Sequence, residues 1–178
     1  QQTLKSKTQS DGSPLPDWAE YPAGVAWVLA EKGLAVRGLC AVFSSDVPRG
    51  AGLSSSASVE LAFATAWMTL GGWKSAPMEL ALLSQRAENK YVGVNCGIMD
   101  QFASACGEKD RLLLLDCRSL KYQALPLPES VVIIIADTSV RHSHTTDAYN
   151  DRRAACEEAV HILKQDLPDI KSLRDVTI

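Results

Sequence analysis

Residues 47–58, VPRGAGLSSSAS, form a glycine- and serine-rich segment directly before a long apolar run at residues 59–70. Gly50 and Gly52 allow the backbone to approach a ligand closely or to adopt a positive φ. The serines supply N-cap oxygens and hydroxyl donors. A loop of this kind that opens a helix aims free N–H groups and the positive helix end at an anion. The pattern therefore predicts either a nucleotide-phosphate loop or an ordinary capped helix after a tight turn.

Two carboxylates further along the chain are candidates for chemistry. Asp100 follows a glycine turn in the segment CGIMDQ at residues 96–101. It is interpreted as a helix N-cap, which its local sequence favours, or as an anion that accepts a hydroxyl proton or orients an attacking alcohol. Glu88 precedes this turn on a predicted helix. It is interpreted as solvent-facing, which is the more common case, or as a Mg²⁺ ligand, because Mg²⁺ prefers one or two carboxylates with phosphate oxygens.

A third polar cluster follows a predicted buried strand. It contains Arg141 and His142, then Tyr149 and Asn150, and an arginine pair at residues 152–153. Arginine beside histidine at such a place predicts either an anion site or a solvated turn that leads into a helix. The local pattern alone leaves both interpretations open.

Hydrophobic periodicity predicts that a mixed α and β chain positions these groups. Apolar residues at helical spacing predict helices at residues 18–32, 59–70, 77–91, 99–106 and 149–164. Alternating or continuous apolar runs predict strands at residues 34–44, 112–116 and 131–137. Asp17 is the predicted N-cap and Gly33 the predicted C-cap of the first helix.

The remaining segments are predicted to be connections. Residues 1–17 are polar and are expected to form a tail or a surface loop without fixed order. Pro126 and Pro128 predict a linker or a domain crossing. The last predicted helix is amphipathic, and its core side is expected to comprise Ala154, Ala155, Val160 and Leu163.

Composition excludes several classes of function. The chain has 178 residues, of which 46% are hydrophobic, so it can bury a core. A net charge of −3 gives no general basic surface for nucleic acid. The five cysteines lack zinc-ligand spacing, and their odd number predicts reduced thiols in a cytoplasmic protein. The longest apolar runs are too short to cross a membrane.

The clusters together resemble a known family. The Gly/Ser loop, CGIMDQ at residues 96–101, DCRSL at 116–120, VRHS at 140–143 and the polar pattern at 149–158 occur in the order found in galactokinases. Galactokinases belong to the GHMP small-molecule kinase superfamily, and the resemblance extends from about residue 18 to residue 158. The loop marks only the superfamily, whereas residues 96–101 and 140–143 are closer to galactokinases than to mevalonate or homoserine kinases.

The resemblance implies ATP and Mg²⁺ as cofactors and galactose as the substrate. Ser56 and Glu88 match positions that hold Mg²⁺, and Asp100 matches the catalytic aspartate near the sugar hydroxyl. Trp18 matches an aromatic residue near adenine. The implied phosphate-binding residues are Gly50, Ala51, Gly52, Leu53, Ser54, Ser55, Ser56 and Ala57, and the implied sugar-binding residues are Gly97, Asp100 and Tyr149.

The fold implied by the resemblance is α+β, with two lobes and the active site between them. Residues 1–128 would form part of the N-terminal lobe, and residues 129–178 would begin the C-terminal lobe. Galactokinases also carry a Gly-Glu-His-Thr-Asp signature, an arginine that pairs with the catalytic aspartate, and a third, glycine-rich motif. These features do not occur in the sequence. The chain is therefore expected to be an internal piece of a galactose 1-kinase, inactive alone and prone to self-association.

Three other functions remain open at this stage. A galactokinase-like sensor binds ATP and galactose together with a regulatory protein, but such sensors lack a Ser-Ala pair that is present here as Ser56-Ala57. A kinase for a related sugar such as N-acetylgalactosamine would share most of these residues. A purely structural interaction domain is opposed by the intact loop and Asp100.

Overall fold

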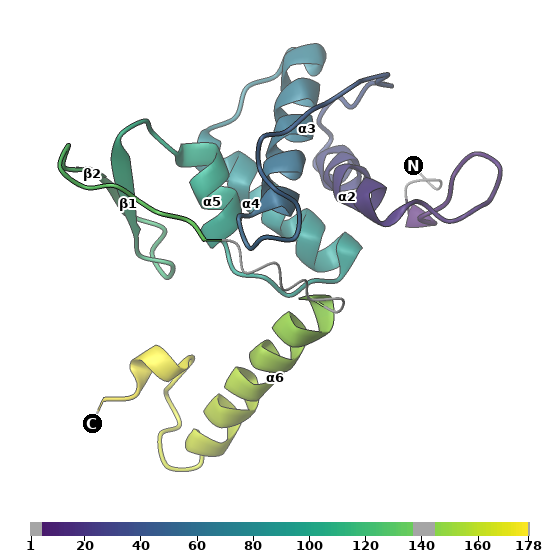
Figure 1. Cartoon of the computed structure of the whole chain (residues 1–178). Helices are drawn as coiled ribbons and strands as arrows, with labels where there is room; N and C mark the ends of the chain where they lie inside the picture. Colours follow the sequence, from purple (N-terminus) through teal and green to yellow (C-terminus); the bar gives the residue numbers. More distant parts are fainter. Residues whose placement is uncertain (1–4, 137–144, 178) are drawn as a thin grey trace.

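The computed structural model describes residues 5–136 and 145–177 of the chain (Figure 1). A group of helices forms the body of the molecule, and a two-stranded hairpin lies beside it, next to α5 (Figure 1). A longer helix extends below the body in this view. The elements are α2 (Asp17–Glu31), α3 (Ser55–Gly71), α4 (Pro77–Ala87), the π-helical turn η1 (Glu88–Val92), α5 (Met99–Cys106), β1 (Arg111–Leu115), β2 (Tyr122–Pro126), α6 (Thr145–Leu163) and the 3₁₀ turn η2 (Leu173–Asp175).

The main core lies between α2, α3 and α4. Its buried side chains are Val25, Val28 and Leu29 from α2, Leu61, Ala64 and Trp67 from α3, and Leu80 and Leu83 from α4. A second apolar cluster joins α4 to α5 and to the hairpin. There the Phe102 ring of α5 contacts the Tyr122 ring of β2, with centroids 5.0 Å apart. The two cores fix α5, and with it Asp100, against the other helices.

Four predicted helices are confirmed within a few residues of their predicted ends, as α2, α3, α5 and α6. The fifth, predicted at residues 77–91, consists of α4 followed by the π-helical turn η1. Asp17 is not an N-cap: α2 begins at Asp17, after Pro16, and no side chain caps its first turn. Lys32 is the C-cap, and Gly33 follows with φ +73°, donating its N–H to the Ala30 carbonyl. Gly33 therefore follows the C-cap with left-handed geometry, and the helix ends one residue earlier than predicted.

The predicted strand at residues 34–44 is wrong, because this segment has no regular structure. Its carbonyl groups accept hydrogen bonds from indole rings instead of from a neighbouring strand. Trp67 Nε1 donates to the Arg37 carbonyl at 3.0 Å, and Trp73 Nε1 donates to the Ala35 carbonyl at 3.1 Å. Apolar alternation shows which residues can face a core, but it does not show whether a partner strand is present.

The predicted strand at residues 112–116 is confirmed as β1, and β2 was not predicted. The strands pair antiparallel in a register that sets Arg111 opposite Pro126 and Leu115 opposite Tyr122. The prolines near the end of β2 had suggested a linker, yet Pro126 occupies the last position of an edge strand, where proline is tolerated. β1 is also less buried than predicted, since Leu112 and Leu114 are exposed.

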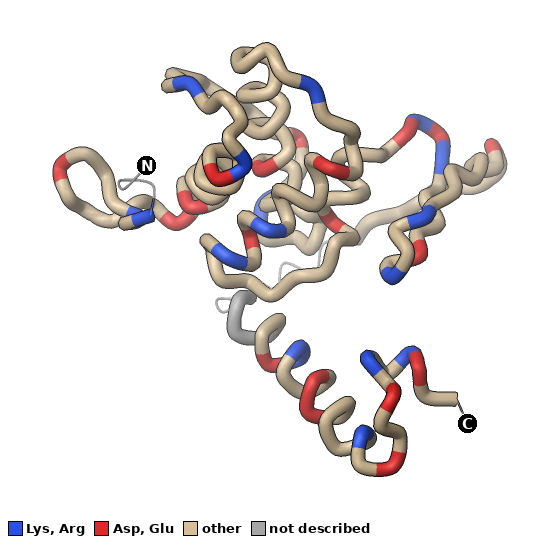
Figure 2. Tube along the Cα trace, turned by 180° about the vertical axis from the view of Figure 1, so that it is seen from behind, with Lys and Arg blue, Asp and Glu red and all other residues tan. Residues whose placement is uncertain are grey.

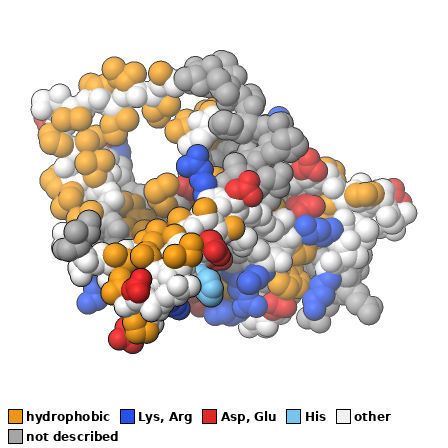
Figure 3. All heavy atoms as spheres, turned by 90° about the horizontal axis from the view of Figure 1, so that it is seen from below, with side chains coloured by type: hydrophobic (Ala, Val, Ile, Leu, Met, Phe, Trp, Pro, Cys, Tyr) orange, Lys and Arg blue, Asp and Glu red, His pale blue; other side chains and the backbone are white. Residues whose placement is uncertain are grey.

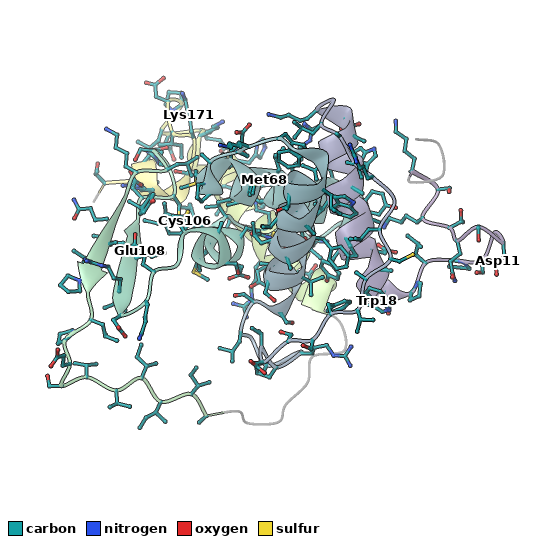
Figure 4. The ribbon with its side chains drawn as sticks, turned by 90° about the horizontal axis from the view of Figure 1, so that it is seen from above. Asp11, Trp18, Met68, Cys106, Glu108 and Lys171 are labelled. Atoms are coloured by element: carbon teal, nitrogen blue, oxygen red, sulfur yellow. The ribbon has the colours of Figure 1, made fainter. Side chains whose placement is uncertain are left out.

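The predicted strand at residues 131–137 is also wrong over its described part. Residues 131–136, VVIIIA, have no regular structure, and Ile134 is 86% exposed. Figure 4 shows this segment extended away from the helices, before the grey trace, with side chains in open space on both sides. Asp137 lies outside the described residues. Hydrophobic side chains also gather on the face seen in Figure 3.

Two sets of polar contacts join α6 and the C-terminal residues to the rest of the chain. The Asn150 side chain accepts from the Asn95 N–H at 3.0 Å and donates to the Gly93 carbonyl at 3.1 Å. Near the C-terminus, Arg118 pairs with Asp175 at 2.6 Å, and Arg174 pairs with Asp116. The core prediction for this helix is wrong in part, since Ala154 and Ala155 are exposed, while Val160 and Leu163 are half-buried.

Positions with Lys or Arg and positions with Asp or Glu are interspersed along the chain trace (Figure 2). The residues before α2 form a short loop, closed by a bridge between Thr8 and Pro14. The boundary predicted between residues 128 and 129 stays a prediction. Within the described residues, no helix combines the length and the apolar character needed to span a bilayer.

The exposed apolar segment 131–136 predicts self-association of the 178-residue chain. Six consecutive apolar residues with no charge can pair with the same segment of another copy. We expect light scattering to detect oligomers at high concentration, and expect I133K together with I135K to reduce them. Gln123→Lys adds a charge at another exposed position and serves as the control. A monodisperse monomer of the unchanged chain would contradict this prediction.

Candidate active site

The glycine- and serine-rich loop leads directly into α3. Gly50 and Gly52 have φ angles of +68° and +72°, which side-chain-bearing residues rarely adopt. Ser54 follows with φ +57° and takes the N-cap position, but its side chain makes no capping hydrogen bond. The interpretation of the loop serines as caps is therefore wrong. The first N–H groups of α3 have no intrahelical acceptors, so this end of the helix can receive an anion.

Glu88 begins the π-helical turn that continues α4. The prediction of a solvent-facing side chain is wrong, because Glu88 is only 6% exposed. Its Oε2 accepts from Gln101 Nε2 at 2.5 Å and from Cys96 Sγ at 3.4 Å. The Ser56 side chain lies close enough to favour the charged form of Glu88 and so to lower its pKa. The turn thus brings Glu88 to the start of α3, beside the phosphate-type loop.

Glu60 is a site residue that sequence reasoning missed. It lies on α3 and is completely buried. Its Oε2 accepts from Gln101 Nε2 at 3.1 Å, while its Oε1 has no hydrogen-bond partner. The available signal was a single carboxylate in the apolar run that begins at Val59, but such a residue is more often exposed than buried.

Burial acts on both buried carboxyls, and hydrogen bonds oppose its effect at Glu88. Burial is the largest cause, and the negative charge of Glu88 the next, of a Glu60 pKa raised to about 9. Burial also raises the pKa of Glu88, although hydrogen bonds from Cys96, Gln101 and Ser56 favour its charged form. Glu60 is therefore protonated at neutral pH. Burial likewise raises the pKa of the Cys96 thiol, which remains a neutral donor.

Asp100 is the second residue of α5. The favoured N-cap interpretation is wrong, because Ile98 is the N-cap and no side chain caps this helix. The Asp100 carboxylate is half-buried. Its charge contributes to the raised pKa values of both Glu60 and Glu88, after the larger effect of burial. The structure thus gathers three carboxyls from α3, η1 and α5.

Tyr149 lies near this acidic group, although it belongs to α6. Burial raises the pKa of its phenol, and the charge of Asp100 is the next largest cause. The neighbouring Asn150 side chain fixes α6 to the turn that contains Gly97 through its contacts with Asn95 and Gly93. A side chain at Gly97 would meet no atom within 4 Å, so the backbone there is open to a ligand.

Trp18 lies away from the acidic group. It is 50% exposed, and its ring lies 5.7 Å from the Phe43 ring. In Figure 4 it lies on the flank of the helices opposite to Cys106. One turn further along α2, Pro22 borders an apolar cavity of about 380 Å³ that Phe63 and Trp67 also line. The adenine role of Trp18 stays a prediction.

The donor set fits Mg²⁺ held together with a nucleotide. The described residues contain no group of three or more His, Cys, Asp or Glu side chains that could hold a metal ion alone. Ser56 and Glu88 instead offer one hydroxyl and one carboxylate, and Ser56 lies close enough to Glu88 to lower its pKa. Mg²⁺ is commonly bound by one or two carboxylates while phosphates and waters complete its octahedron. Arg141, His142 and His144 lie outside the described residues.

Comparison with known proteins places the chain among small-molecule kinases. The family model described as "GHMP kinases N terminal domain" matches residues 20–108. Galactokinases from Roseiflexus sp. and Chloroflexus aggregans are 46% and 47% identical to the chain over 160 and 159 residues. These matches cover 90% and 89% of the chain and 41% of each relative.

A solved structure gives the same relationship. The galactokinase of Lactococcus lactis in complex with galactose superimposes with a TM-score of 0.73 at 32% identity. The match covers 90% of the chain and 42% of that structure. The chain thus spans about two fifths of the length of the relatives that it matches.

Glu60 predicts a distinctive pH dependence of stability. Because its pKa is raised in the folded state to about 9 from the ordinary value of 4.5, folding binds a proton between these pH values. Stability from this group is fully present below about pH 4.5 and is lost as the pH rises toward 9. We expect the isosteric variant E60Q to lose less thermal stability than the unchanged chain between pH 6 and 9. Parallel melting temperatures of the two proteins across this range would contradict the prediction.

Proposed function

Because the chain belongs to the GHMP kinase family, we propose that the protein containing it is an ATP-dependent galactokinase. It would phosphorylate the C1 hydroxyl of D-galactose and release galactose 1-phosphate and ADP. The observation that carries this proposal is the meeting of the loop at the start of α3 with Glu88 and Asp100. Phosphoryl transfer needs held phosphates, a metal-binding group and a carboxylate near the nucleophile. The similarity to galactokinases supports the choice of galactose.

The loop from Gly50 to Ala57 is proposed to hold the nucleotide phosphates. Its positive φ angles allow the backbone to curve around an anion, and the start of α3 presents N–H groups to it. Ser56 and Glu88 are the proposed Mg²⁺ ligands, and the metal would neutralise charge on the transferred phosphoryl group. Trp18 is the proposed contact of adenine.

Asp100 is proposed to act at the sugar hydroxyl. A loose transition state keeps that hydroxyl protonated until late, so the carboxylate can orient it and accept its proton as the new bond forms. Gly97 and Tyr149 are the proposed sugar contacts. The Asn150 hydrogen bonds support this arrangement, since they hold α6 against the turn that precedes Asp100.

A cytoplasmic location is part of the proposal, because the phosphoryl donor is ATP. No nucleic acid or membrane partner is proposed. The main competing function is a sensor that binds ATP and galactose together with a regulatory protein. The Ser56-Ala57 pair favours the catalytic function. A kinase for N-acetylgalactosamine or another related sugar is the second alternative.

The proposed function is tested by ADP release from the full-length protein with MgATP and galactose, beside the 178-residue chain alone. We expect turnover by the full-length protein and much lower turnover by the chain. The variant D100N should lower kcat by about a hundred-fold or more, because it removes the group that accepts the hydroxyl proton.

Asp110→Asn is the matched control, because it removes a carboxylate from an exposed hairpin position. It should leave kcat unchanged. Binding of MgATP and galactose without ADP release would favour the sensor, and turnover restricted to another sugar would favour a different kinase. Equal kcat values for D100N and the unchanged protein would show that Asp100 does not act in the reaction.

A further inference from the structure

Gln101 connects three elements of the candidate site through one amide group. It follows Asp100 on α5, and its side chain is completely buried. The Nε2 atom carries two hydrogens, and two carboxyls accept from it: Glu88 Oε2 at 2.5 Å and Glu60 Oε2 at 3.1 Å. These partners come from η1 and α3. A single side chain therefore links the phosphate-loop helix to the turn with Glu88 and to the helix with Asp100.

This hydrogen-bonded link makes the folded state less stable than an apolar core at the same place would. Gln101 Oε1 and Glu60 Oε1 are both buried without a hydrogen-bond partner. A buried polar network with unsatisfied members is generally less stable than well-packed apolar side chains of similar volume. The contribution of Gln101 to stability therefore does not account for its presence, and its orienting effect on Glu88 is the remaining physical role.

The hydrogen bonds around Glu88 define what is oriented. Gln101 and the Cys96 thiol both donate to the same oxygen, Oε2. The Ser56 hydroxyl reaches the carboxylate from the start of α3. Donors on Oε2 restrict rotation of the Glu88 carboxylate, so its orientation toward Ser56 is fixed.

We infer that Gln101 is a positioning residue, whose amide fixes the Glu88 carboxylate beside Ser56 and uses Glu60 as its anchor on α3. The inference rests on the proposed function in one respect, namely that Glu88 and Ser56 hold the metal of a metal–nucleotide complex. Groups that orient a metal ligand typically change metal affinity or activity by about 10- to 100-fold when they are replaced. Gln101 should therefore affect metal binding more than sugar binding.

The test is Q101M in the full-length protein, because methionine keeps a similar volume without a donor. Mn²⁺ is titrated in the presence of a non-hydrolysable ATP analogue, and free Mn²⁺ is counted by electron paramagnetic resonance. We expect the Mn²⁺ dissociation constant to rise about ten-fold. The KM for galactose should change by less than about two-fold, because the Gln101 amide donates to Glu60 and Glu88 and not to the proposed sugar contacts Gly97 and Tyr149.

Gln85→Met is the matched control. Gln85 is half-buried on α4, and its Nε2 donates to the Cys96 carbonyl at 3.3 Å. The control therefore removes one amide hydrogen bond to the backbone of the segment between η1 and α5, and it leaves the hydrogen bonds of Glu88 in place. We expect unchanged Mn²⁺ affinity in Q85M at a comparable melting temperature. Equal Mn²⁺ affinities for Q101M, Q85M and the unchanged protein would overturn the inference.

A second variant covers the case in which Q101M does not fold. E60M removes the anchor of Gln101 but leaves Glu88 and its donors in place, so it should also weaken Mn²⁺ binding. Unchanged affinity in folded E60M would overturn the inference. The Mn²⁺ titration contains no sugar. A protein that binds Mn²⁺ and nucleotide but does not phosphorylate galactose would thus refute the proposed function alone, and one that binds no Mn²⁺ with nucleotide would refute the inference.

Discussion

Two carboxyl groups are buried between α3, η1 and α5, and their proximity shapes the candidate site. Within the described residues, the groups that act on the pKa of Glu60 and Glu88 are other carboxyls and neutral hydrogen-bond donors. Two charges close together at low dielectric repel strongly. The structure avoids this because Glu60 is neutral and because the Gln101 amide donates to both groups. The surrounding helices must hold the three side chains in fixed positions for this arrangement to persist.

That requirement explains how distant segments come to form one site. The apolar contacts of α2 with α3 and α4 fix the start of α3, where the glycine- and serine-rich loop ends. The second cluster fixes α5 through Phe102, so the neighbouring Asp100 and Gln101 have little freedom. Transition-state stabilisation depends on groups that are in place before the reaction. Two ordinary apolar cores therefore supply the preorganisation that phosphoryl transfer needs.

The sequence predicted the helices and the family better than it predicted the strands. The loop before a helix, the helix at Met99–Cys106 and the family were all recognisable, because glycine, serine and helical periodicity are local signals. Glu60 was missed because one carboxylate in an apolar run does not reveal its burial. Apolar side chains alternate in part over residues 34–44 and are continuous over residues 131–136. Both patterns are typical of strands, but a strand also needs a hydrogen-bonded partner strand, which a local sequence pattern does not reveal. β2 was missed because Pro126 at its end and Pro128 after it suggested a linker instead of a strand.

The distribution of charge gives the site a preference for a cationic partner. The negative charge of Asp100 raises the pKa of Glu88, after the larger effect of burial. Bringing a nucleotide triphosphate to this place would add further negative charge. The N–H groups at the start of α3 would offset part of that charge. A divalent cation beside Ser56 and Glu88 would offset the remainder. The same repulsion would disfavour a nucleotide without its metal, so the acidic group itself selects the metal complex.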